Sequence, residues 1–310
     1  MKMNKKQFVT AAIIGVFALS TAACSGAAAG RTPAAPQPAA QVEDGKGAAT
    51  IAAYNTLAGK RGVRAAELLA ALDAGIRTVS RNEATAMIVA AEAAQKRDLP
   101  GLEEKLAGEG LQRKIGELYR NGIDLDKAGD IGDAELREAL IEVRDGGYRL
   151  DTAEGMYFPV IDYGRYRQYR GLVTADLAAY IDLMAVESDR APAKDAALVI
   201  GWDEMIRRAL AQENFLRTFE DSPRARDVKS LYGRYLSFIF YGANNTPLFA
   251  YDNKTMSAEA RTAYAAAAGT GDSRLAARLK EYLGLLATKG YRLDAEVEEF
   301  RKQAVSDLGD

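Results

Sequence analysis

Apolar residues recur at intervals of three and four along most of this 310-residue chain, which is the spacing of one face of an α-helix. The segments with this pattern are rich in Ala, Leu, Glu, Arg and Lys, which all have high helix propensity. The pattern therefore predicts an all-α fold with about ten helices and no extensive sheet. The expected helical segments are residues 64–75, 82–97, 111–122, 133–147, 174–188, 203–219, 224–242, 257–269, 274–290 and 295–305.

One segment departs from this pattern. Residues 155–163 (GMYFPVIDY) look extended, although Pro159 cannot donate a backbone hydrogen bond and so argues against a central strand. This segment separates two helical regions. We therefore expect the folded part, residues 48–310, to form a compact bundle or two helical lobes, 48–150 and 151–310.

A short motif occurs three times and predicts how helices are joined. Residues 147–151 and 290–294 both read GYRLD, and residues 122–126 read GIDLD. Each copy follows a helical segment, so we expect the glycine to adopt the left-handed conformation that ends a helix. The aspartate at the end of each copy is then expected to cap the next helix.

The third copy overlaps a segment with the spacing of an EF-hand calcium loop, residues 124–135. The carboxylates that would bind calcium are those of Asp124, Asp126, Asp130 and Glu135. Ala128 stands where such a loop supplies an oxygen ligand, and Asp133 is well placed to cap the helix after it. Two capped helices are therefore the preferred interpretation, with a calcium site as the alternative.

The first residues predict export. Three lysines, an apolar run from Phe8 to Leu19 and a stretch of small residues have the order of a secretory signal peptide, which we expect to span residues 1–23. Residues 20–24 (STAAC) resemble the lipobox of bacterial lipoproteins, although Thr21 stands where that family prefers Leu. The resemblance implies that Cys24 carries the lipid and anchors the chain in the membrane.

The composition limits which partners are expected and which kinds of catalysis are possible. Residues 24–47 are rich in Ala, Pro and Gly and are expected to be a disordered tether. Removing residues 1–23 takes away three lysines and no acid, so the net charge falls from −2 to −5, and nucleic acid is not an expected partner. The chain has no histidine, which excludes Ser-His-Asp and Cys-His catalysis, and we expect no cofactor.

A glutamate near the end of one expected helix is a candidate catalytic residue. Glu187 and Ser188, followed by Pro192, resemble the catalytic signature of lytic transglycosylases, which are helical enzymes that cut peptidoglycan. The resemblance implies that Glu187 acts as general acid and base. Arg190 replaces the aromatic residue that the family has there, and the rest of the signature is absent. A solvated helix end is therefore the preferred interpretation.

The densest aromatic and cationic stretch lies in residues 156–171. Aromatic rings stack on sugars, and guanidinium groups bind carboxylates and phosphates. The candidate ligand-binding residues are Tyr163, Arg165, Tyr166, Arg167, Tyr169 and Arg170, together with Trp202 at the start of a later helix. The helical spacing of the tyrosines makes an amphipathic helix, with half-buried tyrosines and arginines that extend to solvent, the preferred interpretation.

These patterns predict a lipoprotein on the extracytoplasmic face of the membrane, with a non-enzymatic binding or scaffold role. The expected partners are the membrane, through the N-terminal lipid, and a cell-wall polymer or another envelope protein. The alternative function is peptidoglycan cleavage by Glu187.

Overall fold

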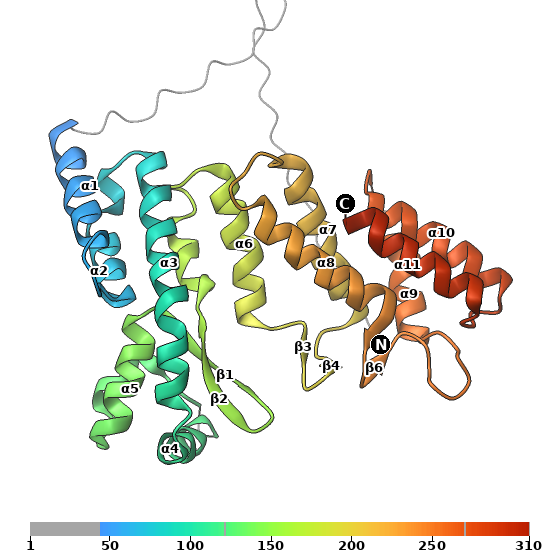
Figure 1. Ribbon diagram of the computed structural model, residues 1–310, viewed down its shortest axis with the longest axis horizontal. Helices are drawn as coiled ribbons and strands as arrows, with labels where there is room; N and C mark the ends of the chain where they lie inside the picture. The colour runs from blue at the N-terminus through green and yellow to red at the C-terminus, as the bar shows by residue number, and fades with distance from the viewer. Residues whose placement is uncertain (1–43, 121, 270, 310) are drawn as a thin grey trace, which may run out of the picture. The chain divides into compact units, whose positions relative to one another are not determined.

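The computed structural model describes residues 44–120, 122–269 and 271–309, and this part of the chain is mostly helical, as the sequence predicts (Figure 1). The α-helices are α1 (Asp44–Ala58), α2 (Ala65–Gly75), α3 (Arg81–Leu106), α4 (Glu109–Tyr119), α5 (Ala134–Asp145), α6 (Ala175–Asp189), α7 (Trp202–Thr218), α8 (Ala225–Tyr241), α9 (Ala258–Ala267), α10 (Arg274–Thr288) and α11 (Ala295–Gly309). Short 3-10 helices cover Ile76–Thr78, Leu125–Asp130 and Tyr163–Tyr169.

The strands are few and short, and they form three antiparallel hairpins. The hairpins pair β1 (Tyr148–Ala153) with β2 (Met156–Ile161), β3 (Ala193–Lys194) with β4 (Ala197–Leu198), and β5 (Gly242–Ala243) with β6 (Thr246–Pro247). The extended conformation expected for residues 155–163 is thus confirmed over β2. Pro159 is compatible with it because β2 pairs on one side only, with Leu150 opposite Pro159.

Helix α3 is longer than the sequence pattern indicates. It begins with a capping box in which the Ser80 hydroxyl accepts from the backbone N–H of Glu83 and the Glu83 carboxylate accepts from that of Ser80. It then continues through Pro100 to Leu106, whereas the pattern ends at residue 97. Leu102 and Leu106 are buried beyond the proline, so tertiary packing stabilises the extra turns.

The glycine motif is confirmed in its first residue and only partly in its last. Gly122, Gly147 and Gly290 have φ angles of +82°, +70° and +62°, which is the left-handed conformation. Asp294 caps α11, since its carboxylate accepts from the N–H of Val297 at 2.9 Å. The prediction for Asp151 is wrong, because this residue lies in β1 and pairs with Lys194 instead of capping a helix.

The buried hydrophobic residues form two clusters within the described part of residues 42–310, which make up one compact unit. One cluster runs from Tyr54 to Ala185 and also includes Phe215 and Val228 of α7 and α8, whereas the other runs from Ile200 to Leu308. Apart from Phe215 and Val228, the two clusters divide between α6 and α7. Helices α7 and α8 pack on each other, and α11 lies against α8 (Figure 1).

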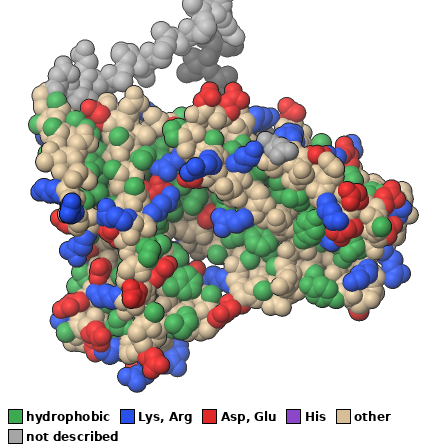
Figure 2. All heavy atoms as spheres, in the orientation of Figure 1, with side chains coloured by type: hydrophobic (Ala, Val, Ile, Leu, Met, Phe, Trp, Pro, Cys, Tyr) green, Lys and Arg blue, Asp and Glu red, His purple; other side chains and the backbone are tan. Residues whose placement is uncertain are grey.

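The expected signal peptide, Cys24 and most of the expected tether lie outside the described residues. Helix α1 begins at Asp44, so the last residues assigned to the tether, 44–47, are helical. None of the helices in the described ranges combines the length and the apolar character needed to cross a membrane. On the face that Figure 2 shows, basic and acidic side chains are interspersed, with hydrophobic side chains between them.

Candidate functional site

Glu187 lies between three helices and is not at a solvated helix end. Its side chain, on α6, is only 14% exposed. The hydroxyl of Tyr235, from α8, donates to Oε1 of Glu187, and Nη1 of Arg208, from α7, lies 3.5 Å from the same oxygen. The preferred interpretation from the sequence is therefore wrong for Glu187. Ser188 also has a structural role, because its hydroxyl accepts from the N–H of Tyr163 and donates to the carbonyl of Ala185.

Burial raises the pKa of the Glu187 carboxyl, and the contacts with Tyr235 and Arg208 only partly oppose this effect. Arg208 compensates Glu187 incompletely because it binds Glu204 more closely, with Nη2 at 2.6 Å and Nε at 2.9 Å from Oε1. A raised pKa is useful to a general acid. However, Glu187 lines none of four cavities of about 430 to 1020 Å³ in the described part of the chain.

Three tyrosines are buried in the aromatic and cationic stretch of residues 156–171, which we call the Tyr-Arg segment. Tyr163, Tyr166 and Tyr169 lie in a 3-10 helix and are 6%, 1% and 2% exposed. Tyr163 donates to Glu92 of α3, and Tyr166 donates to Oε1 of Gln95 at 2.6 Å. These rings are part of the hydrophobic core, so they do not form the expected surface for stacking on a sugar.

The arginines of the same segment lie nearer the surface and are paired with acids. Arg165 lies 3.0 Å from Asp73, Arg167 lies 3.1 Å from Asp189, and Arg170 lies 2.8 Å from Asp182. Buried tyrosines with arginines that extend outward match the preferred interpretation of this segment. The arginines join neighbouring elements and do not form a free cationic face.

A second buried acid, Glu92, was missed by the sequence interpretation. Its side chain is 3% exposed and contacts the hydroxyls of Tyr163 and Tyr180, the ammonium of Lys96 and the guanidinium of Arg224. The sequence does contain a signal. Glu92 follows Ile88 by four residues, on the apolar face of an Ala-rich helix, where an ionised group needs partners.

The remaining candidates do not form a ligand site either. Trp202 is 5% exposed and packs against Tyr264, with ring centroids 6.2 Å apart, so it belongs to the second hydrophobic cluster. The proposed calcium ligands, Asp124, Asp126, Asp130 and Glu135, are all exposed. In the described residues, no group of three acids is close enough to hold a metal ion.

The contacts of residues 124–135 show why these acids stay apart. The Asp124 carboxylate accepts from the N–H of Asp126 and caps the 3-10 helix that follows. The Asp133 carboxylate caps α5 by accepting from the N–H of Leu136. Lys114 lies 2.8 Å from both Asp133 and Glu135, so Glu135 is drawn toward α4. The segment thus consists of two caps, as the preferred interpretation predicts. The motif is wrong about the first cap, which is Asp124, because Asp126 lies inside the 3-10 helix.

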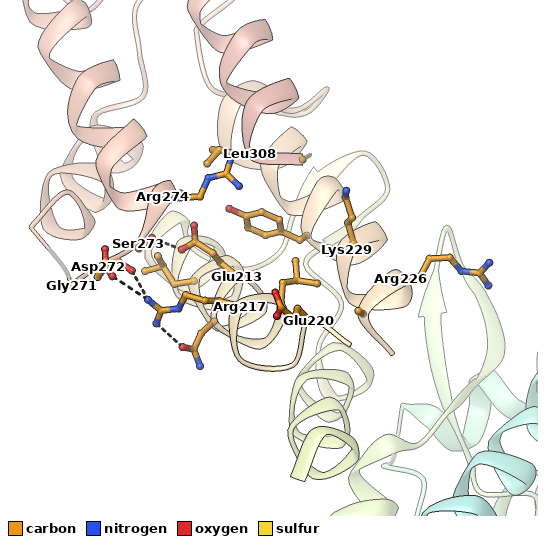
Figure 3. Close-up of a pocket in the computed structure, with 16 residues that line it drawn as sticks. Glu213, Arg217, Glu220, Arg226, Lys229, Gly271, Asp272, Ser273, Arg274 and Leu308 are labelled. Atoms are coloured by element: carbon orange, nitrogen blue, oxygen red, sulfur yellow. Dashed lines mark hydrogen bonds and ion pairs between the residues drawn. The ribbon is translucent and has the colours of Figure 1, made fainter. Parts of the chain in front are cut away.

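The largest of these four cavities lies at the ends of helices in the second half of the chain (Figure 3). Its volume is about 1020 Å³, and it is lined by the C-terminal half of α7, the start of α8, the residues before α10 and the end of α11, with one side open to solvent. Most of its wall is apolar, with Leu210, Leu216 and Leu308 as aliphatic members. No sequence motif marks this cavity, because its walls come from four separate segments.

Two acids on the cavity wall are bound to other parts of the protein. The Glu213 carboxylate accepts from the Ser273 hydroxyl and from the N–H of Leu275 at 2.9 Å, which joins α7 to the start of α10. Arg217 donates to the carbonyl of Asp272 at 3.0 Å and lies 3.5 Å from its carboxylate (Figure 3). These contacts hold the α7 wall against the loop before α10.

Comparison of the chain with models of protein families, with curated proteins and with solved structures finds no match.

Proposed function

We propose that this chain is an exported lipoprotein, anchored through Cys24 on the extracytoplasmic face of the membrane, whose helical body binds a ligand there without catalysing a reaction. The observation that carries the binding role is the cavity of about 1020 Å³ between α7, α8, α10 and α11. Cavities of this size enclose most of a small organic molecule. The signal peptide, the lipobox-like segment and the Ala/Pro-rich residues 24–47 support the anchored location.

The second candidate function is glycan cleavage by Glu187, and it is favoured by one observation. Burial raises the pKa of this carboxyl, which would keep it protonated at a higher pH than an exposed glutamate. Two observations favour binding over cleavage. Tyr235 and Arg208 already contact Oε1 of Glu187, and the carboxylate does not line the large cavity.

The test uses the full chain expressed in a bacterial host, as wild type and as the Cys24→Ser and Glu187→Gln variants. We expect wild type to incorporate labelled palmitate and to fractionate with the membrane, and Cys24→Ser to lose both properties. We also expect neither wild type nor Glu187→Gln to release muropeptides from purified peptidoglycan. Palmitate labelling that survives Cys24→Ser would contradict the anchor. Muropeptide release that Glu187→Gln abolishes would establish the enzyme in place of the binding protein.

A further inference from the structure

The large cavity contains a buried hydroxyl without a partner. Tyr232, on α8, lines the cavity and is 2% exposed, and in the described part of the chain its hydroxyl oxygen makes no hydrogen bond. Buried polar atoms in folded proteins nearly always have a partner. The described residues contain four such atoms without one, on Tyr169, Gln212, Tyr232 and Tyr282, and of these residues only Tyr232 lines the cavity. A tyrosine hydroxyl can donate one hydrogen bond to an acceptor on a ligand.

The hydroxyl lies among the charged groups of the cavity wall. After burial itself, the charge of Glu213 raises the pKa of Tyr232 and the charge of Arg274 opposes the rise. Both also line the cavity. Glu213 is already bound to the start of α10, so Arg274 is the neighbour that can meet a ligand.

The charges around the cavity nearly balance, and Arg274 is the cation that an anion can meet. Four cations line the cavity, Arg217, Arg226, Lys229 and Arg274, against three acids, Glu213, Glu220 and Asp272. Figure 3 shows Arg226 directed away from the other labelled residues, whereas Arg274 lies beside Leu308. Arg274 donates to the backbone carbonyl of Asp307, a contact that does not neutralise its charge.

From these contacts we propose that the cavity binds an amphiphile with an anionic head group, such as a medium-chain carboxylate. The apolar chain lies against Leu210, Leu216 and Leu308. One carboxylate accepts from the Tyr232 hydroxyl and pairs with the Arg274 guanidinium, which gives the hydroxyl its missing partner. The hydroxyl has almost no solvent-exposed surface, so binding requires a local rearrangement of the wall around it. This inference rests on the proposed binding function and names its ligand class.

The test measures decanoate binding to residues 42–310, the compact unit, because detergent around the lipidated chain would compete for the cavity. Isothermal titration compares decanoate with decanol and decylamine, which share its chain but differ in head-group charge. We expect one decanoate per protein, with weaker binding of decanol and the weakest binding of decylamine. Equal affinity for decanoate and decylamine would overturn the proposal, as would the absence of decanoate binding.

Four variants separate binding in the cavity from adsorption elsewhere. Tyr232→Phe and Arg274→Gln should each weaken decanoate binding by about tenfold, the loss expected for one hydrogen bond to a charged group. Asn214→Trp, at an exposed position on the cavity wall, should abolish binding. The matched control Ser230→Trp, exposed on α8 and not part of the wall, should leave it unchanged.

Tyr232→Phe can also be tested by its melting temperature, which a hydroxyl with only a structural role would not change in the same direction. Removing an unpaired buried hydroxyl should raise the melting temperature of the ligand-free protein while weakening decanoate binding. Unchanged affinity in this variant would overturn the role of the hydroxyl. Decanoate binding without palmitate labelling at Cys24 would refute the membrane anchor and leave the cavity inference standing, so the two failures are distinguishable.

Discussion

Replacement of Arg224 by methionine tests whether the buried ion pair between Arg224 and Glu92 stabilises the fold. Arg224 is 12% exposed, forms an ion pair with the 3%-exposed Glu92, and lies over the ring of Tyr180, 4.6 Å from its centroid. The pair joins α3 to the start of α8 across residues far apart in the chain. Methionine retains apolar contact with the Tyr180 ring but removes the charge, so the variant isolates the ion pair.

The expected loss follows from what remains around Glu92. Removing one partner of a buried ion pair typically costs roughly 3–5 kcal/mol, because the other charge stays buried without compensation. Lys96, at 2.7 Å, and the hydroxyls of Tyr163 and Tyr180 still contact the carboxylate in the variant. We therefore expect Arg224→Met to lower the free energy of unfolding by about 3 kcal/mol, the lower end of that range.

The loss of unfolding free energy in Arg224→Met should depend on pH, in a direction that the pKa of Glu92 determines. Burial raises the pKa of Glu92, but Arg224, Lys96 and Tyr163 together outweigh burial and lower it. A lowered pKa in the folded state means that the stabilisation is fully present above the pKa of the unfolded chain, about 4.3, and is lost as the pH falls through the folded-state pKa. The difference between wild type and Arg224→Met should therefore be largest near neutral pH and shrink in acid.

The assay is urea unfolding at several pH values, with Arg226→Met as the matched control on the same helix. Arg226 is exposed, so this control should change the free energy of unfolding by less than about 0.5 kcal/mol. A double-mutant cycle with Glu92→Gln should show that the two substitutions are not additive. Additive effects, or a loss in Arg224→Met that does not change with pH, would refute the reasoning.

Three further perturbations have defined outcomes. Because the pKa of Glu187 is raised in the folded protein, its ionisation destabilises the fold as the pH rises through that pKa. Urea unfolding should therefore show that Glu187→Gln gains stability relative to wild type from mildly acidic to alkaline pH. Gly147→Ala should lower the free energy of unfolding by about 3 kcal/mol in the same assay, since a Cβ at this position would lie 2.6 Å from Gln95. Gly122→Ala is the control: it has open space around it, so it should lower the free energy of unfolding by only about 1 kcal/mol. A millimolar excess of CaCl₂ should shift the melting temperature by less than about 1 °C, because residues 124–135 form two caps; a larger shift would restore the calcium site.

The helical fold could be predicted from sequence because each helix buries one stripe of apolar residues, and that stripe is visible as local spacing. The left-handed glycines could be predicted for a similar reason, since the requirement is local. The position of Asp151 in a strand could not be predicted, because it depends on the pairing of residues 148–153 with residues 156–161. Such pairing is a property of two segments, and neither segment alone indicates it.

The Tyr-Arg segment shows how one spacing fits two interpretations. Tyr163, Tyr166 and Tyr169 are three residues apart, and a 3-10 helix has three residues per turn, so all three rings lie on the same side. That side could be a binding face or a core face. Only the position of α3, which supplies Glu92 and Gln95 as partners, shows that it is the core face.

The two buried carboxylates explain why a perturbed pKa does not by itself identify a catalytic acid. Each is contacted by an arginine from a different helix, yet the pKa of Glu92 is lowered and that of Glu187 is raised. The difference lies in the cations around each acid, since Lys96 also pairs with Glu92 at 2.7 Å. Arg224 bonds directly to Glu92, whereas Arg208 places two of its nitrogens on Glu204 and leaves Glu187 at 3.5 Å. Incomplete compensation in a buried contact between helices is therefore sufficient to raise the pKa of Glu187 without a catalytic role.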